Sequence, residues 1–474
     1  MESAESARPR IVRRRDALKA LSLAAALPLL QACSSGSPSA SPQPTSPSAS
    51  LSQAPSSAGA SSAAATATQP AAAANASSAN AVKLQGAYWS SSPEDHQVFL
   101  NVFKAFSDRN PGVSVDFNDI PSDSFTQKVT TMIVGGTPPD TMELHPAWVL
   151  NYINAHQLND LTDMMKTDRQ AYIPAQLDFW TATGKLWGVP YYSGPSFIFY
   201  NKSLFTKNKV KLPEDYQKEG NWTWDTLREI SKQLSGGSGA NRTFGWDAAQ
   251  DASNLQFYTS VPIWDNQGEL VNQDETAWLL DTEPVVQVMQ WHADMYLKDK
   301  SIPMPSDMQG ISWLFRTGKV GMAWAGKFRS IELANAEFEV GMIGTPKGKV
   351  GPINRDGPNA SGLPVGTKHV PEAYKLALFI GSPDAAPIYL ASGRPVPVRS
   401  DLIASDVFQK SLKPYERIEV YQESIKTVRA WRVPGKGPEE GRAFTAEWQK
   451  VLVGQEDVPT AMKAAKAAMD PLLK

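Results

Sequence analysis

Strand and helix signals alternate between residues 82 and 144, and this alternation limits the folds open to the chain more than any other feature. Residues 82–88 alternate along a strand, and residues 92–95 then open a helix with an N-cap serine, a proline and two acids. Residues 113–120 form the next strand, a second helix follows, and residues 141–144 form a third strand. Three such alternations in so short a stretch predict an α/β layer built on a largely parallel sheet.

The rest of the chain is long enough for further layers. Helical patterns become denser after residue 205, and residues 319–324 and 338–344 have the composition of short buried strands. With 474 residues and 42% hydrophobic content, the chain can form two or more ordinary domains. The formal net charge of −2 provides no basic field, so nucleic acid is not expected as a partner.

The first 32 residues have the features of a targeting segment. Three arginines at positions 13–15 precede an apolar stretch, residues 20–30, that is shorter than the ~20 residues needed to cross a bilayer. The arginine pair resembles a twin-arginine export signal, and the sequence LQAC, which ends at Cys33, resembles a bacterial lipobox. We therefore expect residues 1–32 to be a signal peptide and Cys33, the only cysteine, to be acylated. An ordinary buried or exposed thiol is the alternative.

Residues 33–81 then form a tether. No charged side chain occurs between residues 34 and 80, which are mostly Ser, Ala, Pro, Thr and Gln. Such a composition cannot bury enough apolar surface to offset the entropy of ordering, so it predicts a disordered linker. The globular part is thus expected outside the cytoplasm, anchored to the cell membrane through the lipid on Cys33.

Five stretches of the chain occur in the order typical of one protein family: GGTPPD, GVPYYSGPSFIFYNKSLF, NWTWDTLREISKQL, FRTGKVGMAWAGKFR and VGMIGTPKG. Through them the globular part resembles the extracellular (periplasmic) solute-binding proteins of carbohydrate ABC importers, in the maltose- and oligosaccharide-binding branch. The resemblance implies a type II periplasmic-binding-protein fold, with two α/β lobes, an interlobe cleft and a hinge. It assigns residues 82–193 and about 355–398 to lobe 1, and residues 194–354 and about 399–474 to lobe 2.

The resemblance also explains a break in residues 188–205, where a Ser-Gly-Pro sequence interrupts an otherwise strand-like stretch. It places the first crossing between lobes, and therefore the hinge, at Ser193, Gly194 and Pro195. Tyr191 and Tyr192 would then lie at the floor of the cleft, with their hydroxyls toward ligand or water. A β-bulge with two tyrosines at the edge of a core is the alternative.

Aromatic residues supply most of the candidate ligand contacts. A sugar presents flat C–H patches that stack on planar rings, and the 14 tryptophans of the chain outnumber its 13 tyrosines. Some candidates follow strands, some lie where relatives contact ligand, and Phe328 occupies the position of a sugar-stacking tryptophan in the family. Each could instead be a core or surface residue. The aromatic candidates are Trp89, Trp148, Trp264, Trp324, Phe328 and Trp431.

The polar candidates are Ser90, Glu143, His145, Asp251 and Arg394. Ser90 and Glu143 lie at strand ends, where α/β crevices open. The resemblance places His145 and Asp251 in segments that face ligand in relatives, and Arg394 could donate paired hydrogen bonds. A capping carboxylate, a structural histidine and a salt-bridged loop arginine are the alternatives.

The predicted function is the capture of a mono- or oligosaccharide by a monomer without cofactors, and its delivery to the permease subunits of an ABC transporter. A secreted carbohydrate-active enzyme is one alternative, and a binding protein for a polyol phosphate or a peptide is another. The sequence contains no HExxH or G-x-S-x-G motif, its five histidines lack zinc-ligand spacing, and no pair of acids stands out for glycoside hydrolysis.

Overall fold

The computed structural model of the chain describes residues 81–90, 92–247, 259–308, 310–311, 313–393, 395–431, 435 and 438–473. The predicted signal peptide, Cys33 and all of the predicted linker except Ala81 lie outside these residues. The described residues all belong to one compact unit.

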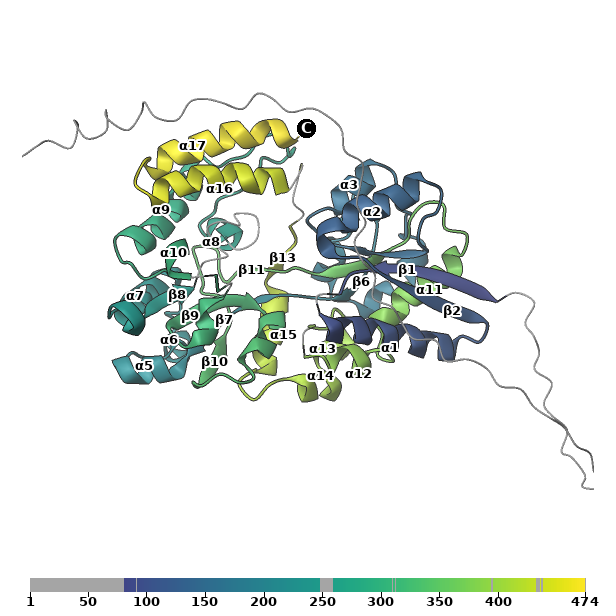
Figure 1. Cartoon of the computed structure of the whole chain (residues 1–474), viewed down its shortest axis with the longest axis horizontal. Helices are drawn as coiled ribbons and strands as arrows, with labels where there is room; N and C mark the ends of the chain where they lie inside the picture. The colour runs from purple at the N-terminus through teal and green to yellow at the C-terminus, as the bar shows by residue number, and fades with distance from the viewer. Residues whose placement is uncertain are drawn as a thin grey trace, which may run out of the picture. The chain divides into compact units, whose positions relative to one another are not determined.

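The first sheet has five strands in the order β2-β1-β3-β12-β6. Figure 1 labels β1, β2 and β6 of this sheet. β1 is parallel to both β2 and β3, whereas β12 is antiparallel to both β3 and β6. The predicted α/β layer is therefore confirmed, but the sheet is mixed and not largely parallel, because β12 and β6 join it through antiparallel pairings. The strands are β1 (Val82–Tyr88), β2 (Val113–Asp119), β3 (Thr141–Leu144), β6 (Val189–Tyr192) and β12 (Asn359–Gly362); the main helices beside them are α1 (Pro93–Arg109), α2 (Ser122–Val134), α3 (Val149–Asn154) and α11 (Val370–Ile380).

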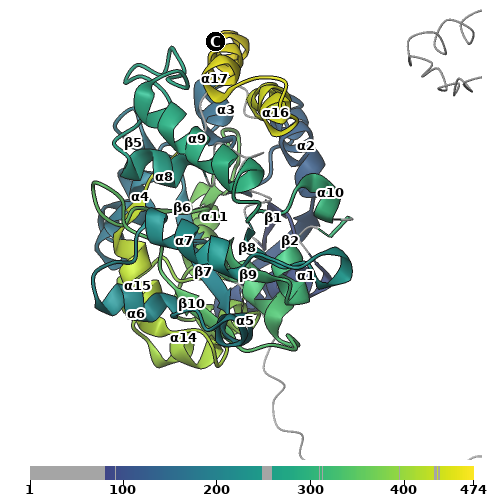
Figure 2. The ribbon, with the colours of Figure 1, turned by 90° about the vertical axis from the view of Figure 1, so that its left-hand side faces the viewer.

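The second sheet has four strands in the order β10-β7-β9-β8, and only β8 and β9 are parallel (Figure 2). Helices α9, α16 and α17 pack against one another beside it. The strands are β7 (Ser196–Asn201), β8 (Phe244–Asp247), β9 (Val320–Gly326) and β10 (Val340–Ile343); the helices are α5 (Lys202–Asn208), α6 (Pro213–Lys218), α7 (Trp224–Leu234), α8 (Ser260–Asp265), α9 (Glu283–Leu297), α10 (Pro305–Met308), α16 (Pro438–Leu452) and α17 (Val458–Met469).

Local sequence explains where the principal helices begin. At α1, Ser92 Oγ accepts a hydrogen bond from the amide of Asp95 at 3.3 Å, and Pro93 occupies the first turn. At α7, Thr223 Oγ1 accepts from the amide of Thr226 at 3.1 Å. These side chains satisfy amide groups that the helix itself leaves unpaired.

The chain passes between the two sheets at the Ser-Gly-Pro break. β6 ends at Tyr192 in the first sheet, and β7 begins at Ser196 in the second. It passes back between β10 and β12 by way of β11 (Asn354–Arg355), which pairs with β13 (Val428–Arg429) in a two-stranded parallel sheet. The expected crossing at Ser193–Pro195 is therefore present, and β7 continues in a different sheet rather than across a bulge.

Buried side chains join the two crossing segments to each other. Asp356 accepts hydrogen bonds from Ser193 Oγ, from the amide of Gly194 at 2.5 Å and from Gln176 Nε2 at 2.7 Å. Asn354 bonds both the amide and the carbonyl of Ser196, at 3.2 and 2.9 Å. Burial raises the pKa of Asp356 above its usual value, and these donors oppose that shift.

Residues from both sheets share one of the three hydrophobic clusters. Leu84 and Phe106 of the first sheet layer belong to it, together with Phe197 of the second sheet and Tyr421. Short helices that follow residue 385 contribute to the same cluster, so these late elements connect the two layers. They are α12 (Ala386–Leu390), α13 (Ser400–Ile403), α14 (Asp406–Ser411) and α15 (Ile418–Lys426).

Candidate functional site

A cavity of about 470 Å³ lies among residues that come from both sheet layers. The ends of β1, β3 and β6 contribute one wall together with α1, and the turn after β9 contributes another. Its position agrees with the general rule that α/β proteins bind ligands beyond the carboxyl ends of their strands. The lining residues are Trp89, Asp95, Val98, Phe99, Val102, Glu143, His145, Tyr191, Tyr192, Phe328, Ile331, Glu332, Asn359, Ile380, Tyr389, Ser392 and Pro395.

Three predicted residues form an aromatic cluster at one side of this cavity. The ring of Trp89 lies 5.3 Å from that of Trp148 and 6.2 Å from that of His145, in edge-to-face arrangements. Burial, and secondarily the guanidinium of Arg355, lower the pKa of His145 to about 3, so its imidazole is neutral. Trp89 and His145 line the cavity, whereas Trp148 contacts both rings but is not among the described lining residues.

Glu143 provides a buried carboxyl group to the cavity and is 1% exposed. Its carboxyl accepts hydrogen bonds from Tyr191 Oη and Asn359 Nδ2, and from the amide of Trp89 at 3.3 Å. Burial raises the pKa of Glu143 to about 8, although the three donors lower it. Near neutral pH the site therefore holds mostly a carboxylic acid rather than a carboxylate.

The two tyrosines at the end of β6 both line the cavity, but they differ from the expectation in one respect. The hydroxyl of Tyr191 donates to Glu143 instead of pointing toward a ligand, and its side chain is 6% exposed. Burial and the neighbouring Glu143 raise the pKa of Tyr191 well above its usual value. The ring of Tyr192 lies 5.6 Å from that of Tyr191 and is partly exposed.

Phe328 provides the aromatic surface on the opposite wall. It follows β9 in the 3-10 turn Lys327–Leu333 and is 47% exposed. A Cβ atom at Gly326 would lie 2.9 Å from the ring of Phe328, so glycine is what allows this ring to lie back over the strand end. Beneath it, the ammonium of Lys327 is fully buried and lies 3.0 Å from Glu416 Oε2.

Several predicted contacts lie elsewhere. Trp264 and Trp324 are 2% and 4% exposed and belong to the hydrophobic cluster on one face of the second sheet. Trp324 lies inside β9 and not at its end, and its partner across the sheet, Ile198, belongs to the same cluster. Trp431 packs beside Trp264, with ring centroids 5.8 Å apart. None of these three is among the described lining residues of this cavity.

The remaining polar candidates are also accounted for. Ser90 donates its hydroxyl to Asp119, whose other oxygen accepts from the amide of Ser90 at 3.0 Å, so this serine closes a turn. Asp251 and Arg394 lie outside the described residues.

About two thirds of the residues that line the cavity were not predicted from the sequence. The sequence predicts a helix that begins at residues 92–95, but not that Val98, Phe99 and Val102 of this helix, α1, line the cavity. Asn359 and Tyr389 come from segments that lie near β6 only after the chain has crossed between sheets twice. Hydrophobic periodicity shows that a helix has an apolar face, but it does not show whether that face packs in a core or lines a cavity.

The arrangement suits the non-covalent binding of a ligand with both apolar and polar surfaces. Aromatic and aliphatic side chains dominate the wall, and carboxyl groups are provided by Asp95, Glu143 and Glu332.

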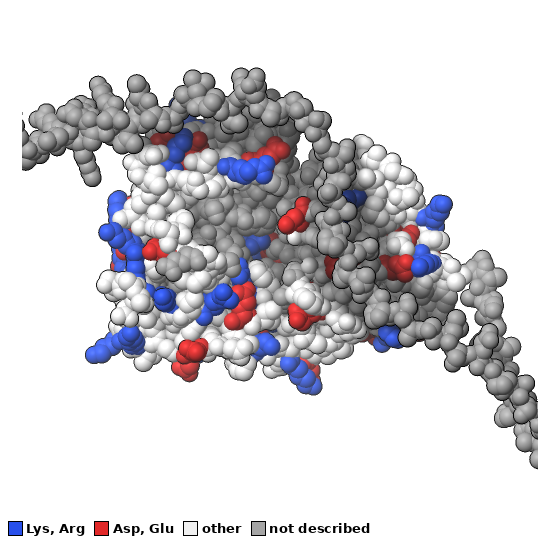
Figure 3. Space-filling model, viewed as in Figure 1, with Lys and Arg blue, Asp and Glu red and all other residues white. Residues whose placement is uncertain are grey.

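Within the described ranges no group of three or more His, Cys, Asp or Glu is arranged to hold a metal ion. Nor does any helix of those ranges combine the length and apolar character that a membrane span requires. On the face drawn in Figure 3, acidic and basic side chains are interspersed.

Two sheets joined by crossing strands, with a cavity between their strand ends, define a type II periplasmic-binding-protein fold. The chain belongs to the bacterial extracellular solute-binding protein family, whose model matches residues 89–387. It is therefore a solute-binding protein that functions outside the cytoplasm.

Individual relatives are distant but extend over most of the chain. A protein of Brucella abortus that is named only as a binding protein is 24% identical over 407 residues, which cover 84% of this chain and 95% of the relative. The ABC substrate-binding protein from Listeria monocytogenes in complex with cycloalternan has a TM-score of 0.71 at 21% identity, covering 82% of this chain and 98% of its own. The cyclic alpha-maltosyl-1,6-maltose binding protein from Arthrobacter globiformis has a TM-score of 0.69 at 21% identity, covering 83% and 99%.

Proposed function

We propose that this protein is the membrane-tethered binding component of an ABC importer, and that it captures a mono- or oligosaccharide and delivers it to the permease subunits. The family supports the general role of solute binding. The Listeria and Arthrobacter proteins with the same fold are named for carbohydrate ligands, which supports a sugar as the solute.

The observation that carries the proposal is the composition of the cavity wall. Trp89 and Tyr192 on one side, and Phe328 on the other, offer ring faces to the C–H patches of a sugar. Glu143 and Asn359 at the floor, with Asp95 at the wall, offer groups that hydrogen-bond hydroxyls. A ligand held from both sides stabilises a closed arrangement only through contacts that the open arrangement lacks.

The crossing segments are the proposed hinge. Ser193, Gly194 and Pro195 form a short bridge between β6 and β7, and small residues of this kind absorb changes in φ and ψ. On this proposal the lobes comprise residues 82–193 with about 355–398, and residues 194–354 with about 399–474. The closed form then docks on the permease and releases the sugar when it opens.

The proposal includes an acylated Cys33 as the membrane anchor, a monomeric state, and binding without chemical conversion of the ligand. The single cysteine after a short apolar stretch supports the anchor. The match to a family of binding proteins supports capture rather than catalysis.

A thermal-shift screen of the purified protein against a panel of sugars tests this proposal. A sugar present at about 100 times its dissociation constant adds ~2.7 kcal/mol to the stability and raises the melting temperature. The stabilising sugar is then recovered and analysed: intact sugar is the expected result, and cleaved sugar would identify an enzyme. Trp89→Ala is expected to abolish the shift, whereas the matched variant Trp187→Phe, on a buried ring outside the cavity, retains it.

A further inference from the structure

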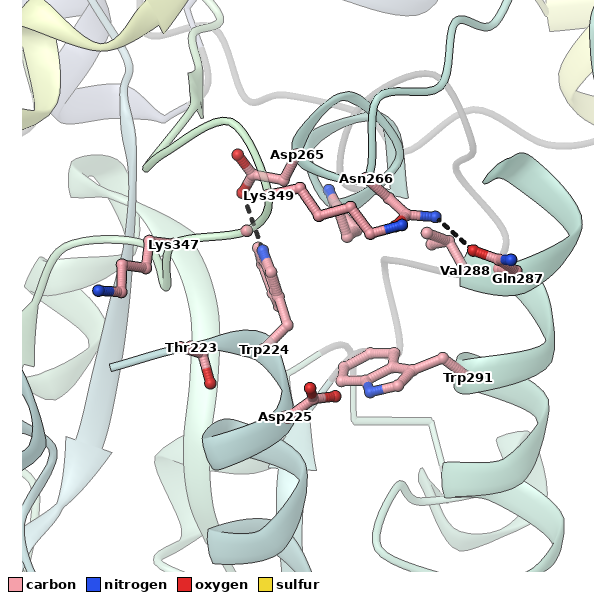
Figure 4. Close-up of a pocket in the computed structure, with 12 residues that line it drawn as sticks. Thr223, Trp224, Asp225, Asp265, Asn266, Gln287, Val288, Trp291, Lys347 and Lys349 are labelled. Carbon is pink, nitrogen blue, oxygen red and sulfur yellow. Dashed lines mark hydrogen bonds between the residues drawn. The ribbon is translucent and has the colours of Figure 1, made fainter. Parts of the chain in front are cut away.

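A second cavity, of about 390 Å³, lies on the helical side of the second sheet (Figure 4). The start of α7, the end of α8, the middle of α9 and the loop between β10 and β11 form its walls. No described residue lines both this cavity and the first one. Its described lining residues are Thr223, Trp224, Asp225, Pro262, Asp265, Asn266, Gln287, Val288, Trp291, Lys347, Gly348 and Lys349.

Two indole rings form a fixed corner in this cavity. The rings of Trp224 and Trp291 lie 6.2 Å apart at an interplanar angle of 87°, and both side chains are partly exposed. Trp224 Nε1 donates to Asp265 Oδ2 at 2.8 Å, and the buried ring of Trp324 supports Trp224 from behind at 5.4 Å. Rings held in place before a ligand arrives lose little conformational entropy when it binds.

Polar groups of both signs surround this corner. Asp265 is 1% exposed and also accepts from the amide of Ile353 at 3.3 Å, and burial raises its pKa to about 7. Asn266 Nδ2 donates to Gln287 Oε1 at 3.1 Å.

The loop between β10 and β11 adds two basic side chains. The side chain of Lys349 extends between Asp265 and Asn266 in Figure 4. The backbone amides of Lys347 and Lys349 donate to the carbonyls of Trp222 and Asp265 at 3.0 and 2.8 Å, and within the described residues neither ammonium group has a hydrogen bond or an ion pair. Opposite them, Asp225 is exposed at the wall. Because the two lysines are opposed by two carboxyl groups, the wall favours a ligand rich in hydroxyls over one of high charge.

We propose that this second cavity is a separate binding site for a saccharide unit. Trp224 and Trp291 stack on the C–H patches of the sugar, and Lys349, Asp225 and Asn266 hydrogen-bond its hydroxyls. The volume lies within the range of about 300–1,000 Å³ that small-molecule sites occupy. This proposal does not depend on the identity of the ligand in the first cavity, because the two sites share no described residue.

Fluorine NMR of the purified protein, with 5-fluorotryptophan at every tryptophan, tests the proposal. The resonances of Trp224 and Trp291 are assigned from Trp224→Phe and Trp291→Phe, and that of Trp89 reports the first cavity in the same spectra. Maltotriose, cellotriose and arabinotriose are titrated separately to about 10 mM, which detects millimolar dissociation constants. At least one of them is expected to shift the Trp224 and Trp291 resonances in a saturable way.

Variants distinguish the two cavities. Trp291→Ala is expected to weaken this binding at least about tenfold, and Lys349→Ala at least about threefold with little risk to folding. Glu229→Ala, on an exposed part of the same helix α7 outside the cavity, and Phe328→Ala, in the first cavity, should leave it unchanged. The proposal is overturned if no trisaccharide shifts either resonance, or if Phe328→Ala raises the dissociation constant read from these two resonances as much as the one read from Trp89, since the shifts would then originate in the first cavity.

Discussion

Glu143→Gln is expected to remove a large pH dependence from the stability of the ligand-free protein. In the folded state the Glu143 carboxyl is buried, and burial raises its pKa from 4.5 to about 8. Glutamine has nearly the same shape but does not ionise. It keeps an oxygen that can accept from Tyr191 and Asn359, although its amide group then faces the amide of Trp89, which is also a donor.

The magnitude follows from proton linkage. Below about pH 4.5 Glu143 is protonated in both the folded and the unfolded state, so burying its carboxyl carries no cost of protonation and the folded state has its full stability. Between pH 4.5 and about 8 the unfolded state releases the proton while the folded state retains it, so the folding free energy becomes less favourable as pH rises. At ~1.4 kcal/mol for each pH unit, the whole shift is worth about 5 kcal/mol, and about 4 kcal/mol of it is lost between pH 4.5 and pH 8, because Glu143 is half-titrated in the unfolded state at the first pH and in the folded state at the second.

Urea unfolding at pH 4.5 and pH 8 measures this effect. Relative to the unaltered protein, Glu143→Gln should gain about 4 kcal/mol between the two pH values, after a pH-independent cost of about 1–3 kcal/mol for the facing donors. Glu332→Gln is the matched control, because Glu332 also lines the cavity but pairs with Arg329 at 2.9 Å and is partly exposed. It should change the stability by less than ~1 kcal/mol at either pH.

A stability difference between Glu143→Gln and the unaltered protein that is the same at both pH values would refute this reasoning. It would mean that the three hydrogen-bond donors outweigh burial and keep Glu143 ionised at neutral pH.

Three further perturbations test other parts of the structure. Phe328→Ala should weaken sugar binding about fivefold by calorimetry, because covering the exposed half of the ring is worth about 1 kcal/mol, and it should leave the melting temperature nearly unchanged. Asp356→Ala should lower the unfolding free energy by about 2–4 kcal/mol, since it leaves Ser193 and other buried donors unpaired; an unchanged urea midpoint would contradict this. Lys327→Met should cost about 3–5 kcal/mol because it leaves the Glu416 carboxylate buried without its cation, whereas adding Glu416→Gln should restore part of the loss, because it removes the buried charge and keeps an acceptor for the Tyr421 hydroxyl.

The sequence predicts the first sheet well because its information is local. Alternation in β1 and β2, and the capping residues of α1, are each contained within a few residues of the chain. The crossing at Ser193–Pro195 was expected only through the family resemblance, because a Ser-Gly-Pro break is equally compatible with a bulge inside one sheet.

The candidate site was predicted in part. Trp89 and Glu143 lie at the ends of strands of the first sheet, and the rule for α/β strand ends is sufficient to predict them near the cavity, whereas His145 was predicted through the family resemblance. Trp324 was expected at the cavity because it ends a strand-like run, and Trp264 because it lies between an apolar run and a glycine turn, but their neighbours in the second sheet and in α8 place both in the core. That outcome depends on packing between distant segments, which a local pattern does not record.

A crystal structure of the protein with the sugar found in the thermal-shift screen tests the central claim most directly. We expect an intact sugar in the first cavity, in contact with Trp89 from the first sheet layer and with Phe328 from the second. A sugar that contacts residues of one layer only, with no contribution from the other, would contradict the proposed capture between two lobes.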